Sequence, residues 1–158
     1  MNISKLLSSR VRNIKKNPFP ADLKSQSEFL NLKIQNQKVL IIGGAGTIGS
    51  SYIKQVLKYK PSKITVVDIN ENGLTELTRD LRSSNLLDYN PEYITYPVNL
   101  LSDTFNKIFN SENWDIIANF SAHKHVRSEK DTISVEALIK NNVFGAIKLL
   151  KLCSETPP

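Results

Sequence analysis

A single cysteine, Cys153, occurs among the 158 residues, so the chain can form no internal disulfide. This composition suits a reducing compartment, and we expect a cytoplasmic protein. The chain has no run of about 18 apolar residues, so no transmembrane segment is expected. His123 and His125 are the two histidines, and with Cys153 distant in sequence they supply too few ligands for a metal ion. We therefore expect no metal site.

Excess basic charge is confined to the start of the chain. Residues 1–38 carry eight lysine and arginine side chains against two acidic ones, so they account for the whole net charge of +6. The other 120 residues hold 13 basic and 13 acidic side chains. A nucleic-acid partner is not expected, because its binding requires a basic face on the fold itself.

Residues 1–37 are predicted to form a basic helical extension. Apolar residues recur on one helical face over residues 3–14, and the two prolines in 17–20 end that helix. A second short helix is predicted over residues 22–32. Three roles stay open for this extension: packing on the main domain or on a second subunit, binding of an acidic membrane surface, or a cleaved targeting peptide.

From residue 38 onward, strand-like and helix-like segments alternate. Strands are predicted within 39–42, 63–68, 92–98 and 114–122, and helices within 47–59, 71–85, 102–110 and 131–152. In the first of these helices we expect Ile48 to face inward with Tyr52, Ile53, Val56 and Leu57. Apolar strands that alternate with helices indicate a parallel sheet covered on both faces. The predicted fold class is therefore α/β, a Rossmann-type doubly wound sheet of about four strands over residues 38–158.

Glycines are concentrated where the first strand ends. Gly43, Gly46 and Gly49 form G-x-x-G-x-x-G, and Gly44, Gly46 and Gly49 also satisfy G-x-G-x-x-G. Between a strand and a helix this motif is typical of dinucleotide binding. Glycine permits a turn with positive φ, and a pyrophosphate can then bind at the amino end of the helix that begins near Thr47. The alternative is a plain glycine-rich turn.

Asp68 ends the next strand, roughly 20 residues after the glycine loop. A carboxylate there accepts hydrogen bonds from both hydroxyls of an adenosine ribose and repels a 2′-phosphate, which indicates NAD rather than NADP. The alternative is a cap for the helix that starts near Asn70. Two further strand ends, at Asn99 and within 119–124, should face the same crevice. The residues expected to bind the cofactor are Gly43, Gly46, Thr47, Ile48, Gly49, Asp68, Ile69, Asn70, Asn99, Leu100, Ser121, Ala122 and His123.

The segments "GGAGTIG", "VVD", "NFSAHKHVRSEKD" and "NNVFGAIKLL" resemble the extended short-chain dehydrogenase/reductase superfamily. Within it, they are similar to the nucleotide-sugar 4,6-dehydratases of bacterial polysaccharide biosynthesis, over about residues 38–152. Residues 122–126 match the "AHKHV" run of that group, whereas 119–121 replace its leading "HAA". The resemblance implies NAD as cofactor and a nucleotide sugar, such as a UDP-sugar, as substrate. It also implies that Lys124 or His125 faces the substrate diphosphate, and we expect a homo-oligomer.

The same resemblance implies that Asn142 supports the backbone of the active site; a solvated helix residue is the alternative. It further implies a catalytic tyrosine and lysine, spaced Tyr-x-x-x-Lys after a fifth strand. Tyr59 and Lys63 have this spacing, but Pro61 lies between them and they join the first helix to the second strand, so we reject them. No catalytic residue is expected in this chain, which is interpreted as the N-terminal part of a longer enzyme and as inactive alone. A 4-epimerase and a non-catalytic NAD-binding module are the competing hypotheses.

Overall fold

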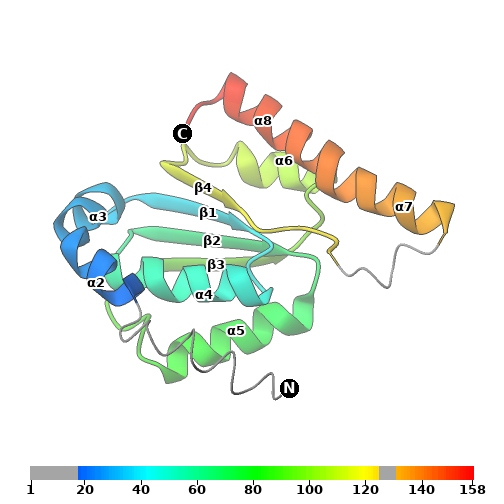
Figure 1. Ribbon diagram of the computed structural model, residues 1–158. Coiled ribbons are helices and arrows are strands. Elements are labelled where there is room, and N and C mark those ends of the chain that lie inside the picture. The colour runs from blue at the N-terminus through cyan, green and yellow to red at the C-terminus, as the bar shows by residue number, and fades with distance from the viewer. Residues whose placement is uncertain (1–17, 125–130) are drawn as a thin grey trace, which may run out of the picture. The chain divides into compact units, whose positions relative to one another are not determined.

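The computed structural model describes residues 18–124 and 131–158 (Figure 1). The chain divides into two units, with the boundary between residues 33 and 34. The helix predicted over residues 3–14 lies outside the described residues. Instead of one helix over 22–32, the first unit contains α2 (Pro18–Ser25), and α3 (Ser27–Ile34) follows it. The predicted start is wrong because proline, which has no N–H to satisfy, is tolerated in the first turn of a helix.

A four-stranded parallel sheet forms the centre of the second unit, as predicted (Figure 1). Its strands are β1 (Lys38–Ile42), β2 (Lys63–Asp68), β3 (Glu92–Pro97) and β4 (Ile116–Asn119), in the order β3-β2-β1-β4. Ile42 at the end of β1 pairs with Val67 on one side and with Asn119 on the other. The carboxyl ends of the strands therefore meet along one edge.

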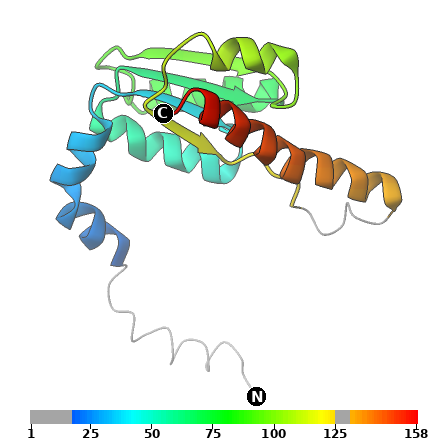
Figure 2. The same cartoon turned by 90° about the horizontal axis from the view of Figure 1, so that it is seen from above.

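Helices cover both faces of the sheet (Figure 2). Successive side chains of a strand point to opposite faces, so Val39 and Ile41 of β1 belong to one buried cluster and Leu40 and Ile42 to another. The first cluster is completed by α4 (Thr47–Val56), the 3-10 helix η1 (Leu57–Tyr59) and α5 (Glu71–Ser83). The second is completed by α6 (Asp103–Phe109) and α8 (Gly145–Glu155).

Two details of the helices differ from the prediction. Ile48 is 57% exposed, so its expected inward orientation is wrong. The inward face of α4 carries Gly49, Ile53 and Val56, and Ile48 lies about 100° around the helix from Gly49. The helix predicted over 131–152 is also not a continuous α-helix. A π-helix, η2 (Lys140–Phe144), separates α7 (Thr132–Ile139) from α8. In the described part of the chain, no helix combines the length and the apolar character needed to cross a membrane.

Charged side chains cluster at the opposite edge of the sheet, where the strands begin. Lys63 Nζ lies 2.6 Å from Glu112 Oε1 and 2.9 Å from Glu92 Oε1, and Lys38 Nζ lies 2.7 Å from Glu112 Oε2. Hydrogen bonds from Lys38 and Lys63 lower the pKa of Glu112 to about 2. Lys63 is therefore paired within this cluster, at the edge of the sheet opposite the glycine loop. This agrees with our rejection of Lys63 as half of a catalytic pair.

We expect the free energy of unfolding to fall less steeply with decreasing pH in the Glu112→Gln variant than in the unmodified chain. The folded-state pKa of Glu112 is about 2 and its ordinary value is 4.5. The ionised Glu112 carboxylate therefore stabilises the folded chain fully above pH 4.5, and this contribution is lost as the pH falls toward 2. Urea unfolding followed by circular dichroism between pH 6 and pH 3 measures this. Glu76→Gln, which alters only an exposed pair with Arg79, is the matched control. Equal acid dependence in the Glu112→Gln variant and the unmodified chain would contradict the role of the cluster.

Candidate functional site

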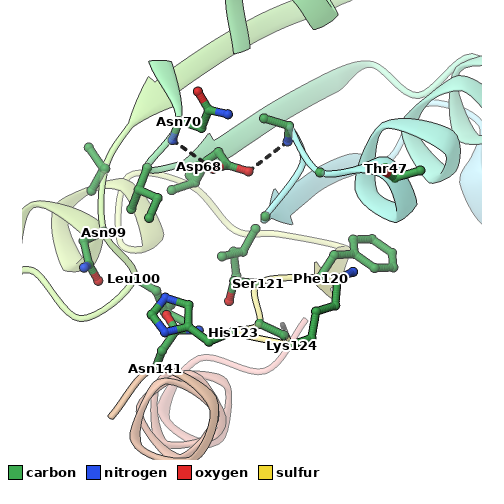
Figure 3. A pocket seen from close by; sticks show the side chains of 18 residues that line it. Thr47, Asp68, Asn70, Asn99, Leu100, Phe120, Ser121, His123, Lys124 and Asn141 are labelled. Carbon is green, nitrogen blue, oxygen red and sulfur yellow. Dashed lines mark hydrogen bonds between the residues drawn. The ribbon is translucent and has the colours of Figure 1, made fainter. Parts of the chain in front are cut away.

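A pocket of about 460 Å³ opens at the carboxyl ends of the strands (Figure 3). Each of the four strands contributes residues at its end or directly after it. The pocket is lined by Ile42, Gly43, Ala45, Gly46, Thr47, Val67, Asp68, Ile69, Asn70, Val98, Asn99, Leu100, Phe120, Ser121, Ala122, His123, Lys124 and Asn141.

The glycines of the loop after β1 have different tasks. Gly43 has φ +75°, and a Cβ atom there would collide with the backbone of Ser121. A Cβ atom at Gly49 would collide with the carbonyl oxygen of Gly43, so this glycine allows α4 to pack on the loop. At Gly46, by contrast, a Cβ atom would meet nothing closer than Gly43 O at 3.5 Å. Packing therefore does not require glycine at position 46, which borders the pocket.

The amino end of α4 faces the pocket without a capping side chain. Its N-cap residue is Gly46, which has no side chain to accept a hydrogen bond from the first turn. Thr47, the first residue of α4, also lines the pocket. Uncapped N–H groups at the positive end of a helix dipole favour an anion such as a phosphate.

Asp68 connects the glycine loop to the segment after β2. Its Oδ2 accepts a hydrogen bond from Ala45 N at 2.9 Å, and its Oδ1 accepts one from Asn70 N at 2.9 Å (Figure 3). The N-cap of α5 is Asn70 itself, whose side chain accepts from Gly73 N. Of the alternative that Asp68 caps this helix, the structure shows only the bond from the N–H of the N-cap residue. Each carboxylate oxygen accepts more than one hydrogen bond, so Asp68 can still receive a ligand hydroxyl.

The segment after β4 is held by asparagine side chains. Asn142 in η2 accepts a hydrogen bond from His123 N and donates one to His123 O, both at 2.8 Å. Asn141 donates to Asn142 Oδ1 at 2.9 Å and itself lines the pocket. Asn142 thus holds the backbone of His123 and is not merely a solvated helix residue, while the assignment of that backbone to an active site stays a prediction.

Most of the predicted binding residues come together in this pocket. Twelve of them line it: Gly43, Gly46, Thr47, Asp68, Ile69, Asn70, Asn99, Leu100, Ser121, Ala122, His123 and Lys124. Ile48 and Gly49 do not line it, and His125 lies outside the described residues. Whether these residues contact a cofactor stays a prediction.

Six further residues line the pocket that are not among the residues expected to bind a ligand, although Phe120 lies within the strand end 119–124 that was expected to face the crevice: Ile42, Ala45, Val67, Val98, Phe120 and Asn141. The first five are direct sequence neighbours of predicted residues at the strand ends, and this adjacency could have identified them. Asn141 had only its position beside Asn142 as a signal.

A protein-family model described as "Polysaccharide biosynthesis protein" matches residues 39–157. The chain belongs to this family. It is 36% identical over 128 residues to a dTDP-D-glucose 4,6-dehydratase of Dictyostelium discoideum. This match covers 74% of this chain and 26% of that protein. It is also 32% identical over 123 residues to a UDP-glucose 4-epimerase of Mycoplasma pneumoniae. This match covers 75% of this chain and 32% of that protein.

A solved structure confirms the Rossmann-type fold. The Bordetella bronchiseptica enzyme WbmF, in complex with NAD+ and UDP, superimposes with a TM-score of 0.59 at 18% identity, over 78% of this chain and 34% of that one. The chain thus spans about a third or less of the length of the proteins to which it is compared.

We expect Asp68→Asn to destabilise the chain before any ligand is added. An asparagine has one acceptor oxygen, so its Nδ2 group would face the N–H of Ala45 or of Asn70. Loss of one charged hydrogen bond should lower the free energy of unfolding by about 1–3 kcal/mol. Urea unfolding measures the loss, and Asp88→Asn, an exposed change of the same charge, is the control. Unfolding midpoints that are equal for Asp68→Asn and Asp88→Asn would contradict the connecting role of Asp68.

Proposed function

We propose that the chain binds NAD in this pocket and is the cofactor-binding part of an NAD-dependent nucleotide-sugar 4,6-dehydratase. The observation that carries the proposal is the convergence of the uncapped amino end of α4 and the carboxylate of Asp68 on one pocket. The pyrophosphate of a dinucleotide suits the amino end of α4, and its ribose diol suits the carboxylate of Asp68. The open space at Gly46 and the acceptor capacity of Asp68 fit this molecule.

Each part of the cofactor has a counterpart in the order of the strands. The pyrophosphate would lie over Gly46 and Thr47 after β1, and the adenosine ribose at Asp68 after β2. The base would then lie against Asn99 and Leu100 after β3. Ser121 to His123, after β4 on the other side of β1, would face the nicotinamide half. NAD is preferred over NADP because the carboxylate of Asp68 repels a 2′-phosphate.

A nucleotide sugar is the proposed substrate. Lys124 supplies an exposed cation at the pocket, which suits a sugar-nucleotide diphosphate, and His125 remains a further candidate for this contact. The 36% identity to a dTDP-D-glucose 4,6-dehydratase supports the substrate class and the reaction. When bound, NAD supplies a hydride acceptor for the sugar. The described residues of this chain bind and orient the two ligands, and none of them is assigned a proton transfer.

A nucleotide-sugar 4-epimerase is the second candidate. The 32% identity to a UDP-glucose 4-epimerase favours it. The two candidates share the NAD pocket and differ in what happens to the oxidised sugar. Mass spectrometry of the product formed by the full-length protein distinguishes them, because dehydration removes one water and epimerisation leaves the mass unchanged.

Calorimetric titration should show NAD binding at least about tenfold tighter than NADP, since tenfold corresponds to roughly 1.4 kcal/mol of repulsion at Asp68. Asp68→Ala should reduce the ratio of NAD affinity to NADP affinity, because it removes the carboxylate. Equal or tighter binding of NADP to the unmodified chain would contradict the proposed cofactor.

The binding site is tested by two matched valine variants. Gly46→Val places a branched side chain where the pyrophosphate would lie and should abolish NAD binding with a native-like circular dichroism spectrum. Ser51→Val puts the same side chain on an exposed position of α4 that does not line the pocket, and it should bind NAD normally.

A further inference from the structure

The turn after β3, residues 99–102, forms the pocket wall beside Asp68. Asn99 O accepts from Ser102 N at 3.0 Å and from Ser102 Oγ at 2.7 Å. The side-chain oxygen of Asn99 accepts from Leu101 N at 2.8 Å. Because Oδ1 is bound in this way, the orientation of the amide is fixed and Nδ2 is left as its hydrogen-bond donor. Asn99 and Leu100 both line the pocket.

Lys148, on α8, holds this turn and does not itself line the pocket. Its Nζ donates to Ser102 O at 2.8 Å and lies 5.8 Å from the centre of the Phe105 ring. One turn earlier on α8, a Cβ atom at Gly145 would come within 3.1 Å of Leu100 Cδ2, so the helix backbone also packs closely against Leu100. Thus α8 contacts the turn at two points.

The position of Lys148 is unfavourable for a cation by itself. Burial lowers the pKa of its ammonium group, although Asp103 raises it. The ammonium also lies beside the amino end of α6, where the helix dipole disfavours positive charge. The bond to Ser102 O offsets these costs, and its effect is to fix the carbonyl at the end of the turn.

We propose that Lys148 is a positioning residue for the adenine side of the cofactor site. By holding Ser102 O, it fixes the turn that presents Asn99 Nδ2 and the side chain of Leu100 to the base. This inference rests on the proposed function, which places the ribose at Asp68 and the base next to it, over the end of β3. An amide donor such as Nδ2 pairs with a ring nitrogen of adenine.

Lys148→Met tests the proposal, because methionine keeps an apolar stem over Phe105 and removes the donor. Lys148→Arg restores a donor, and Lys151→Met removes an exposed lysine from the same helix as the matched control. Binding of NAD and of ADP-ribose is measured by calorimetry. Hydrogen exchange of the amides of Leu101 and Ser102 is measured without ligand, together with the melting temperature.

We expect Lys148→Met to weaken the binding of NAD and of ADP-ribose alike by about three- to tenfold and to speed exchange in the turn. This is less than the full effect of one lost charged hydrogen bond, because the bond acts on the ligand only through the turn. Lys148→Arg should regain most of the affinity, and Lys151→Met should stay within about twofold of the unmodified chain. A purely structural role would lower the melting temperature without this selective exchange. Binding by Lys148→Met equal to that of the unmodified chain would overturn this inference alone. Absence of NAD binding by the unmodified chain would overturn the proposed function and this inference with it.

Discussion

Three backbone segments meet at Gly43 with no room for a side chain between them. A Cβ atom at this residue would collide with Ser121, and Gly43 O is approached so closely by α4 that Gly49 must also lack a side chain. The contact also continues the sheet, since Gly43 N donates to Val67 O and Phe120 N donates to Ile42 O, both at 2.7 Å. Strand pairing brings the ends of β1, β2 and β4 together, and the positive φ at Gly43 lets the chain turn so that the start of α4 reaches the same pocket.

Polar side chains that bind backbone then complete the walls of that pocket. Asp68 bonds to the glycine loop, Asn99 bonds within the turn after β3, and Asn142 bonds to His123. In the proposed function, Asp68 and Asn99 have a second task, because their remaining lone pairs or protons meet the cofactor. Substitutions at Asp68 and Asn99 should therefore change both the order of the loops and the affinity for the ligand. Gly46 differs from them, because packing within the chain does not require glycine there.

The sheet was predictable because its strands are short apolar runs bounded by polar or glycine residues. The sites at the strand ends were predictable for the same reason, since parallel strands bring their carboxyl ends to one edge. The exposure of Ile48 and the interruption of the last helix at 140–144 were not. The bonds of Asn142 to His123 join residues 19 positions apart, and the bond of Asp68 to Ala45 joins residues 23 apart. Local periodicity carries no information on such contacts, so the role of Asn142 came only from the family resemblance.

In the proposed function, a dinucleotide occupies the pocket at the carboxyl ends of the strands. An NMR titration of the 158-residue chain with NAD tests it most directly, because every backbone amide reports its own environment. We predict that the largest shifts fall on the amides of residues 45–47, 68–70, 99–100 and 121–123, and that the amides of the charged cluster around Glu112 do not shift. Shifts centred on another surface, such as the groove between α6 and α8 at Phe144 and Lys151, or no saturable shifts at all, would contradict it.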